Sequence, residues 1–217
     1  SKGYQAEWNG GKMHSEWVRD PVKVYLAVDG PKACRLAGEV ADGIMFLGVH
    51  PEHIKWRMEL FNQGASIAGR DLSGIDIFAR TIIYPSESKE QASKEIRPYI
   101  AGFEYISRAL TSSSPDYQDL RKRLDKSDPG LVEQILADYK AYNLAKLNAD
   151  TRAWSEIVSS RTLDFFCITG SEEEVCHRIY TMGSLGVTNV TTMLATLSLP
   201  KNLMYKIRDR IMPHFRN

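Results

Sequence analysis

Val22 to Gly48 read VKVYLAVDGPKACRLAGEVADGIMFLG, and this stretch decides the fold. An apolar run ends at the turn Asp29-Gly30-Pro31, a short amphipathic segment follows, and an Ala-Asp-Gly break precedes a second apolar run. This order predicts a strand, a helix and another strand in one βαβ unit. The first run is almost continuously apolar, which is typical of a strand buried on both faces of a parallel sheet.

The helix of this unit is predicted to begin at the turn, with Asp29 as its N-cap and Pro31 in its first turn. Apolar side chains then recur at helical spacing, so that one stripe of the helix covers the sheet. The stripe consists of Ala33, Leu36, Ala37 and Val40.

The alternation of strand and helix continues along the chain, which indicates parallel strands with right-handed crossovers. Strands are predicted at Val22–Val28, Gly43–Leu47, Ile75–Tyr84 and Val187–Leu194. Helix boundaries are predicted at Pro51 and Gly69, at the Ser88/Gln91 and Ser171/Glu174 capping boxes, and at Pro200 and Phe215.

A helical insertion at about residues 92–160 interrupts this alternation. Such insertions serve as lids or subunit contacts in some α/β proteins and simply pack on the core in others, and the sequence leaves both open. The four predicted strands, each followed by a helix, make about four βα units. A (β/α)8 TIM barrel has eight. We expect residues 1–217 to form a single α/β domain that holds half the strands of a barrel.

Composition excludes several classes of partner. The chain has 217 residues, 43% of them apolar, with a net charge of +1 and a mean hydropathy of −0.33, so neither nucleic acid nor a membrane surface is an expected partner. No apolar run approaches the ~20 residues of a membrane span and no targeting segment is present, so a cytoplasmic location is expected. Cys34, Cys167 and Cys176 lie in apolar patterns and are interpreted as buried thiols.

The turn after the first strand is the best candidate for binding a cofactor. In parallel α/β proteins, functional groups gather where the strands end. Gly30 permits close approach of a ligand, the N–H groups of Lys32 and Ala33 lie in the first helical turn, and Lys32 adds a cation. An ordinary βα turn is the alternative, and Asp29 disfavours an anion unless its carboxylate caps the helix or binds a ligand hydroxyl.

Two other polar residues lie at or near strand ends. His50 follows the second strand and is either a substrate contact or acid–base group, or an ordinary loop histidine. Arg80 lies inside the third strand and needs a partner, either an anionic ligand or a carboxylate from a neighbouring strand. The histidines show no metal-ligand spacing, so no metal site is predicted.

Two motifs resemble the bacterial luciferase-like monooxygenase superfamily, and in particular its deazaflavin-dependent methylenetetrahydromethanopterin reductase-like branch. The first is VYLAVDGPKACRLAGEVADGIM, at residues 24–45, and the second is FCITGSEEEVCHRIYTMGSLGVTNV, at Phe166–Val190. The resemblance covers the chain from about Pro21 onward and identifies it with the C-terminal half of the family's barrel. The chain also starts at Ser1 without an initiator Met, as expected for the middle of a longer polypeptide.

The resemblance implies a (β/α)8 barrel that holds FMN or the deazaflavin coenzyme F420. Residue by residue, it implies cofactor binding at Asp29, Gly30, Lys32 and Ala33, and substrate binding at Leu47 and His50. Asp29 replaces the usual Ser or Gly, and the apolar Leu47 argues against a phosphorylated sugar. The family's catalytic N-terminal strands have no counterpart here, so no catalytic residue is assigned.

The resulting expectation is a flavin- or deazaflavin-dependent oxidoreductase that acts on a small organic substrate by hydride transfer or oxygen activation. Its expected partners are the N-terminal half of the barrel or a second copy of the chain. The alternative is a non-catalytic truncated barrel or fragment that serves as a ligand-binding or assembly module, because open sheet edges invite association.

Overall fold

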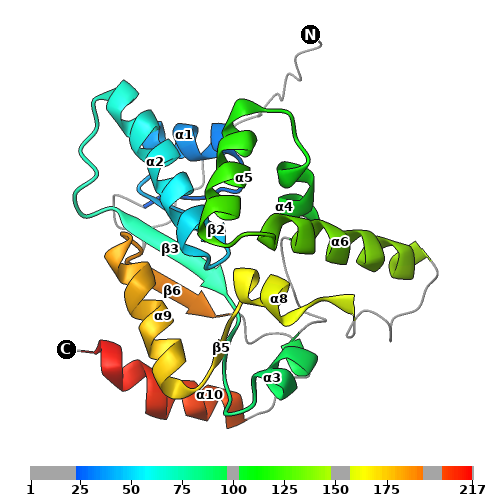
Figure 1. Cartoon of the computed structure of the whole chain (residues 1–217). Helices are drawn as coiled ribbons and strands as arrows, with labels where there is room; N and C mark the ends of the chain where they lie inside the picture. Colours follow the sequence, from blue (N-terminus) through cyan, green and yellow to red (C-terminus); the bar gives the residue numbers. More distant parts are fainter. Residues whose placement is uncertain (1–22, 97–102, 148–156, 193–201, 217) are drawn as a thin grey trace, which may run out of the picture.

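The computed structural model describes residues 23–96, 103–147, 157–192 and 202–216, and these form an α/β fold with parallel strands (Figure 1). The larger sheet has the order β1-β2-β3-β6, and β4 pairs with β5 in a second sheet. The strands are β1 (Tyr25–Ala27), β2 (Gly43–Leu47), β3 (Asp76–Thr81), β4 (Ile83–Pro85), β5 (Ile168–Gly170) and β6 (Asn189–Thr192). Every pair is parallel, and the described strands do not close into a barrel.

The predicted third strand is divided in the structure, and a further strand was not predicted. The chain bends at Ile82, so that β3 pairs with β6 whereas β4 pairs with β5. The sequence Ile-Thr-Gly of β5 is too short to show a periodicity of its own. The described chain therefore contains six short strands instead of the four expected.

The expected burial of the first strand on both faces is wrong. Tyr25 and Ala27 of β1 are exposed and Leu26 between them is half-buried, and Tyr25 is 38% exposed. β1 is an edge strand of the described sheet, with β2 on one side. In β2, Ile44 and Phe46 are buried whereas Met45 and Leu47 on the opposite face are half-buried, so one face of the sheet remains partly open.

Helices α1 (Pro31–Val40) and α2 (Pro51–Ala68) pack against each other through glycine (Figure 1). A Cβ atom on Gly64 would lie 1.8 Å from the Arg35 carbonyl oxygen, and one on Gly38 would lie 2.0 Å from the Phe61 carbonyl oxygen. The two helix backbones are in contact at these points. Any residue larger than glycine would hold them further apart.

This close contact explains a second wrong expectation. Leu36 and Val40 of the predicted stripe are 51% and 60% exposed. Ala37 of the stripe is buried as predicted, and the other buried residues of α1 are Pro31, Cys34 and Gly38. Small side chains were needed there because α2 lies so near.

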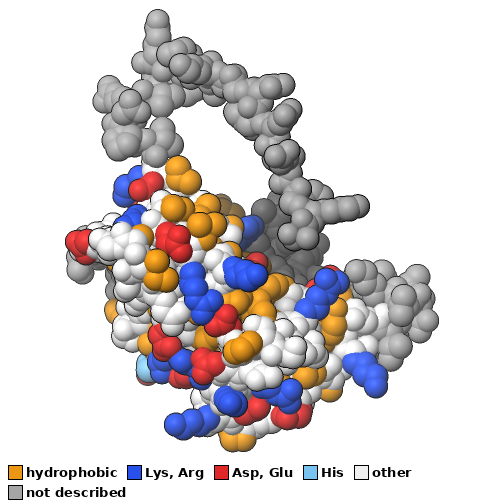
Figure 2. Space-filling view, turned by 90° about the horizontal axis from the view of Figure 1, so that it is seen from above, with side chains coloured by type: hydrophobic (Ala, Val, Ile, Leu, Met, Phe, Trp, Pro, Cys, Tyr) orange, Lys and Arg blue, Asp and Glu red, His pale blue; other side chains and the backbone are white. Residues whose placement is uncertain are grey.

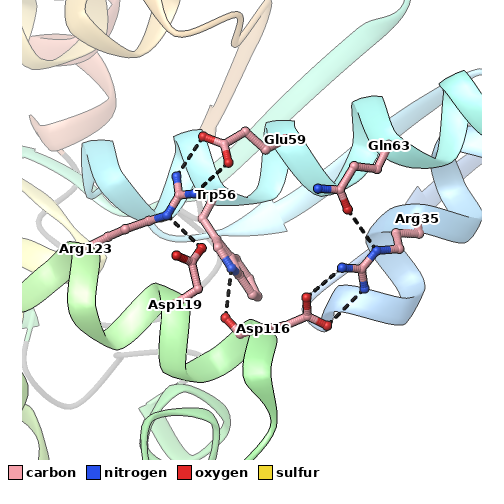
Figure 3. A network of polar contacts seen from close by, with 7 residues as sticks. All are labelled: Arg35, Trp56, Glu59, Gln63, Asp116, Asp119 and Arg123. Atoms are coloured by element: carbon pink, nitrogen blue, oxygen red, sulfur yellow. Dashed lines mark hydrogen bonds and ion pairs between the residues drawn. The ribbon is translucent and has the colours of Figure 1, made fainter.

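The helical insertion forms α3 (Lys89–Ile96), α4 (Phe103–Leu110), α5 (Pro115–Ser127) and α6 (Leu131–Leu147), and is followed by α8 (Ser160–Phe166). Its α5 is bound to both α1 and α2 (Figure 3). Asp116 accepts two bonds from Arg35, of 2.6 and 3.0 Å, and its carbonyl accepts one from Trp56 Nε1. Arg123 makes two 2.7 Å bonds to Glu59. These contacts show that α5 packs on α1 and α2.

Several predicted helix ends are confirmed. Ser171 and Glu174 form a reciprocal capping box at the start of α9 (Glu172–Ser184), and Gly69 ends α2 in the left-handed conformation with φ of 64°. Gln91 N–H bonds to Ser88 Oγ before α3. The last predicted helix appears as α10 (Asn202–Lys206), a π-helical turn at Ile207–Ile211 and a 3-10 turn at Met212–Phe215.

Residues 193–194 of the last predicted strand, and Pro200 at the predicted start of the last helix, lie outside the described residues. No described helix is both long and apolar enough to cross a membrane. Lys and Arg side chains are interspersed with Asp and Glu on the face seen in Figure 2, so this face presents no patch of one charge.

Candidate functional site

The turn after β1 and the loop after β2 lie next to each other at one edge of the sheet. Parallel pairing sets Leu26 beside Ile44 and Ala27 beside Met45, and Val28 N–H continues the ladder with a 2.8 Å bond to Met45 O. The predicted cofactor turn, beginning at Asp29, and the predicted substrate loop, beginning at Leu47, therefore leave the sheet side by side. This edge is where ligands bind in open α/β sheets.

The N-cap of α1 is Gly30 and not Asp29, which corrects the predicted cap. The first intrahelical bond runs from Cys34 N–H to Gly30 O over 3.0 Å, so the N–H groups of Lys32 and Ala33 have no acceptor within the helix. The first turn of α1 contains no acidic residue, and Lys32 is exposed. These donors and this cation suit an anion such as a phosphate.

The Asp29 side chain is directed to Arg57 of α2. Arg57 Nη2 lies 3.5 Å from Asp29 Oδ1, and Arg57 Nη1 donates a 2.5 Å bond to the carbonyl oxygen of Leu47. One guanidinium thus joins the turn after β1 to the loop after β2. The Arg57 side chain is 1% exposed and its carbon Cζ lies 5.1 Å from the centre of the Phe46 ring, and burial lowers its pKa.

Two tyrosines of the insertion cover the glycine of this turn. Tyr105 donates a hydrogen bond to the Asp29 carbonyl, and the Tyr105 and Tyr117 hydroxyls are 2.8 Å apart. A Cβ atom on Gly30 would lie 3.3 Å from the Tyr117 hydroxyl. Burial raises the pKa of Tyr105, so its phenol stays protonated and able to donate.

His50 and His53 lie on either end of the first turn of α2, and each ring stacks on Phe165 with 5.3 Å between ring centres. Among the described residues, His50 Nδ1 and both ring nitrogens of His53 have no hydrogen-bond partner. Burial lowers the pKa of His50 to about 4 and that of His53 well below its ordinary value. Both imidazoles are therefore neutral at pH 7 and are unsuited to serve as cations.

The remaining sequence expectations have mixed outcomes. Arg80 is exposed on β3, beside Leu47 and Thr191, and no carboxylate among the described residues pairs with it. Cys34, Cys167 and Cys176 are buried and free, as predicted, and burial raises the pKa of Cys34 to about 11. No group of three potential metal ligands is found within the described ranges.

Sequence reasoning missed Arg57, although a signal for it was present. Arg57 follows Ile54 by three residues and precedes Phe61 by four, so it lies on the apolar face of α2. A charge on such a stripe requires a buried partner. The tyrosine pair carried no comparable signal, because nothing in the sequence shows that α4 and α5 return to the first turn.

Parallel strands whose polar loops gather at one edge, with free N–H donors at a helix start, define a class of α/β proteins built to hold a ligand there. The chain belongs to the luciferase-like monooxygenase family, whose model matches residues 5–189, and this confirms the resemblance seen in the motifs.

Curated relatives are similar over most of this chain. The 5,10-methylenetetrahydromethanopterin reductase of Archaeoglobus fulgidus is 24% identical over 184 residues, which are 85% of this chain and 51% of that protein. The reductase of the same name from Methanolobus tindarius is 24% identical over 190 residues, 87% of this chain and 52% of that protein. The chain thus spans about half the length of the curated relatives it matches.

Solved structures show the same fold. The coenzyme F420 dependent tetrahydromethanopterin reductase from Methanopyrus kandleri superposes with a TM-score of 0.65 at 22% identity, over 90% of this chain and 51% of that one. An F420-dependent secondary alcohol dehydrogenase, solved with an F420-acetone adduct, has a TM-score of 0.52 at 16% identity, over 80% of this chain and 43% of that one. The described strands therefore have the arrangement found in luciferase-like TIM-barrel proteins.

Proposed function

We propose that the protein is a flavin- or deazaflavin-dependent oxidoreductase that acts on a small organic substrate in the cytoplasm. In this proposal residues 1–217 form a single α/β domain, the C-terminal half of a (β/α)8 barrel with a helical insertion at about 92–160. The family match over residues 5–189 carries the proposal, and the relatives named as reductases support it.

The turn after β1 fits the anionic tail of FMN or coenzyme F420. Lys32 and Ala33 offer N–H groups that have no acceptor among the described residues, and the exposed Lys32 adds a positive charge. A ligand at Gly30 would contact the hydroxyls of Tyr105 and Tyr117, which lie beside this glycine. Asp29 completes the proposed cofactor site as an acceptor for a ligand hydroxyl, since one of its carboxylate oxygens is directed to Arg57. In this assignment Leu47 and His50 line the substrate side.

When bound, the cofactor ring supplies the two-electron chemistry. This chain's residues then bind and orient: the N–H groups of the first turn of α1 fix the tail, and Leu47 presents an apolar surface that excludes water from the substrate. His50 and His53 are neutral, so each contributes an uncharged ring with one N–H donor and one acceptor nitrogen. The proposal assigns catalytic groups to the partner half of the barrel.

The test is a titration of the full-length protein that contains this chain with FMN and, separately, with coenzyme F420. We expect one of the two to show saturable quenching of its fluorescence, followed by a change in its absorbance when a reduced or oxidised substrate is added. Unchanged fluorescence with both cofactors would overturn the proposal.

A non-catalytic binding module is the second candidate, because the chain spans about half the length of its relatives. It requires that this chain alone be stable and bind a ligand. A stable, cofactor-free monomer in sedimentation, with no gain on adding an N-terminal half, would favour this module over the enzyme.

A further inference from the structure

Arg57 is a buried cation whose charge is only partly compensated. Its guanidinium has one carboxylate, Asp29 Oδ1, at 3.5 Å, and its Nε has no hydrogen-bond partner among the described residues. Burial of an arginine is costly unless the geometry of its ion pair is excellent. A leucine or methionine would fill this position on the apolar face of α2 at lower cost, so the guanidinium is expected to serve the turn it contacts.

Asp29 creates the need for such a cation. It directly precedes Gly30, the N-cap of α1, and the N–H groups of Lys32 and Ala33 in the following turn have no acceptor among the described residues. An uncompensated carboxylate there would repel a phosphate over a few ångströms. Its side chain is 44% exposed, so it faces the same solvent from which a ligand would enter.

Both the main-chain carbonyl and the side-chain carboxylate of Asp29 have a partner. Tyr105 donates to its main-chain carbonyl, and Arg57 contacts its carboxylate. Arg57 in turn is fixed by its 2.5 Å bond to the Leu47 carbonyl. The orientation of the carboxylate thus depends on α2 and on the insertion, and not on the turn alone.

We propose that Arg57 is a positioning residue that neutralises Asp29 and turns its carboxylate aside, so that the start of α1 accepts the phosphate-bearing tail of the cofactor. The inference rests on the proposed function, and it goes beyond it by assigning a role to a residue outside the turn. Arg57 acts through Asp29 and need not touch the cofactor.

A double-mutant cycle tests this role through dissociation constants measured on the full-length protein. Arg57→Met is expected to raise the Kd of the bound cofactor about tenfold, because Asp29 then repels the phosphate. Asp29→Asn in the same chain removes that repulsion and is expected to restore most of the lost affinity. Arg57→Lys keeps the charge but lacks the planar fork that reaches Asp29 and Leu47 from separate nitrogens, so its Kd is expected to lie between those of the wild type and Arg57→Met.

Arg178 of α9 provides a matched control. It is a half-buried arginine whose Nη2 donates a 2.6 Å bond to the Asp164 carbonyl and whose Nη1 lies 3.5 Å from the Asp164 carboxylate. Arg178→Met is expected to lower the thermal unfolding temperature as Arg57→Met does, while the Kd stays within about twofold of the wild type. An equal loss of affinity in both variants would show a general effect of stability and overturn the proposal.

Inorganic phosphate separates this inference from the proposed function. Amide chemical shifts of Lys32 and Ala33 are followed during a phosphate titration of the wild type, of Arg57→Met, and of Arg57→Met combined with Asp29→Asn. If the wild type binds neither cofactor but phosphate shifts these amides, the proposed function fails; loss of those shifts in Arg57→Met and their recovery with Asp29→Asn would still support the role of Arg57. Two results would overturn the role of Arg57. One is an affinity for phosphate and cofactor that is unchanged in Arg57→Met, and the other is a lost affinity that Asp29→Asn does not restore.

Discussion

At the scale of single residues, the two histidines at the start of α2 are neutral rings, His53 buried and His50 half-buried. His53 is 2% exposed, and neither of its ring nitrogens has a partner among the described residues. The charged groups near one or other ring are Arg57, Glu52, Lys55, Asp128 and Arg178. Protonating either imidazole requires water, so acid opens the packing around Phe165.

This burial predicts a loss of stability in acid. The folded-state pKa of His50, about 4, lies below its unfolded value near 6.5, so the unfolded chain binds more protons between these pH values. The stability that the two neutral histidines contribute is fully present above pH 6.5 and is lost as the pH falls toward 4. Each histidine adds at most about 1.4 kcal/mol per pH unit to the slope of the free energy of unfolding against pH.

The measurement is the free energy of unfolding in urea at a series of pH values. His53→Leu is expected to flatten the acid limb, since it removes one of the two groups. The exposed His177 on α9 is the control, and His177→Gln should leave the limb unchanged. An acid limb of the same slope in His53→Leu and the wild type would contradict this account.

At the scale of elements, the crossing of α1 and α2 fixes the candidate site, because α1 begins at the proposed cofactor turn and α2 carries Arg57. The two backbones touch at Gly38 and Gly64. Any side chain at Gly64 would push the helices apart and change the position of Arg57 relative to Asp29.

Gly64→Ala is therefore predicted to destabilise the protein by roughly 1–3 kcal/mol, although alanine favours a helix more than glycine does. Gly183→Ala in α9 is the matched control. No atom of the described residues lies within 4 Å of its added Cβ, so it should stabilise by about 0.5–1 kcal/mol. Urea unfolding midpoints measure both, and a stabilising Gly64→Ala would disprove the close helix contact.

Elements with a strong local signal were predictable from the sequence. The capping box at Ser171 and the glycine stop at Gly69 depend on neighbouring residues, and both are found where expected. The division of β3 from β4 at Ile82 depends on which strands pair across the fold, and β5 has three residues, so neither left a local pattern.

The candidate site divides in the same way. The loops after β1 and β2 follow from the order of strands, and the structure brings Asp29 and Leu47 together as predicted. Their connection through Arg57, and the hydroxyls of Tyr105 and Tyr117 above Gly30, arise from long-range packing. The exposure of Leu36 likewise follows from the nearness of α2, which no periodicity in α1 records.

At the scale of the whole molecule, the chain spans about half the length of its relatives and its described sheet ends at β1 on one side and β6 on the other. Val24, beside β1, is 57% exposed, and Tyr25 is 38% exposed. An edge strand with exposed apolar side chains is a surface on which further chain pairs.

We therefore predict that the 217-residue chain expressed alone self-associates. Analytical ultracentrifugation should show an average mass that rises with concentration, whereas co-expression with the N-terminal half should give one defined species. A monomer over the whole concentration range would contradict the half-barrel assignment.

The measurement that tests the central claim most directly is a crystal structure of the full-length protein with its cofactor bound. The account predicts phosphate oxygens within about 2.7–3.2 Å of the Lys32 and Ala33 backbone nitrogens, with the guanidinium of Arg57 between Asp29 and Leu47. A cofactor bound elsewhere, with the start of α1 free of any phosphate, would contradict it.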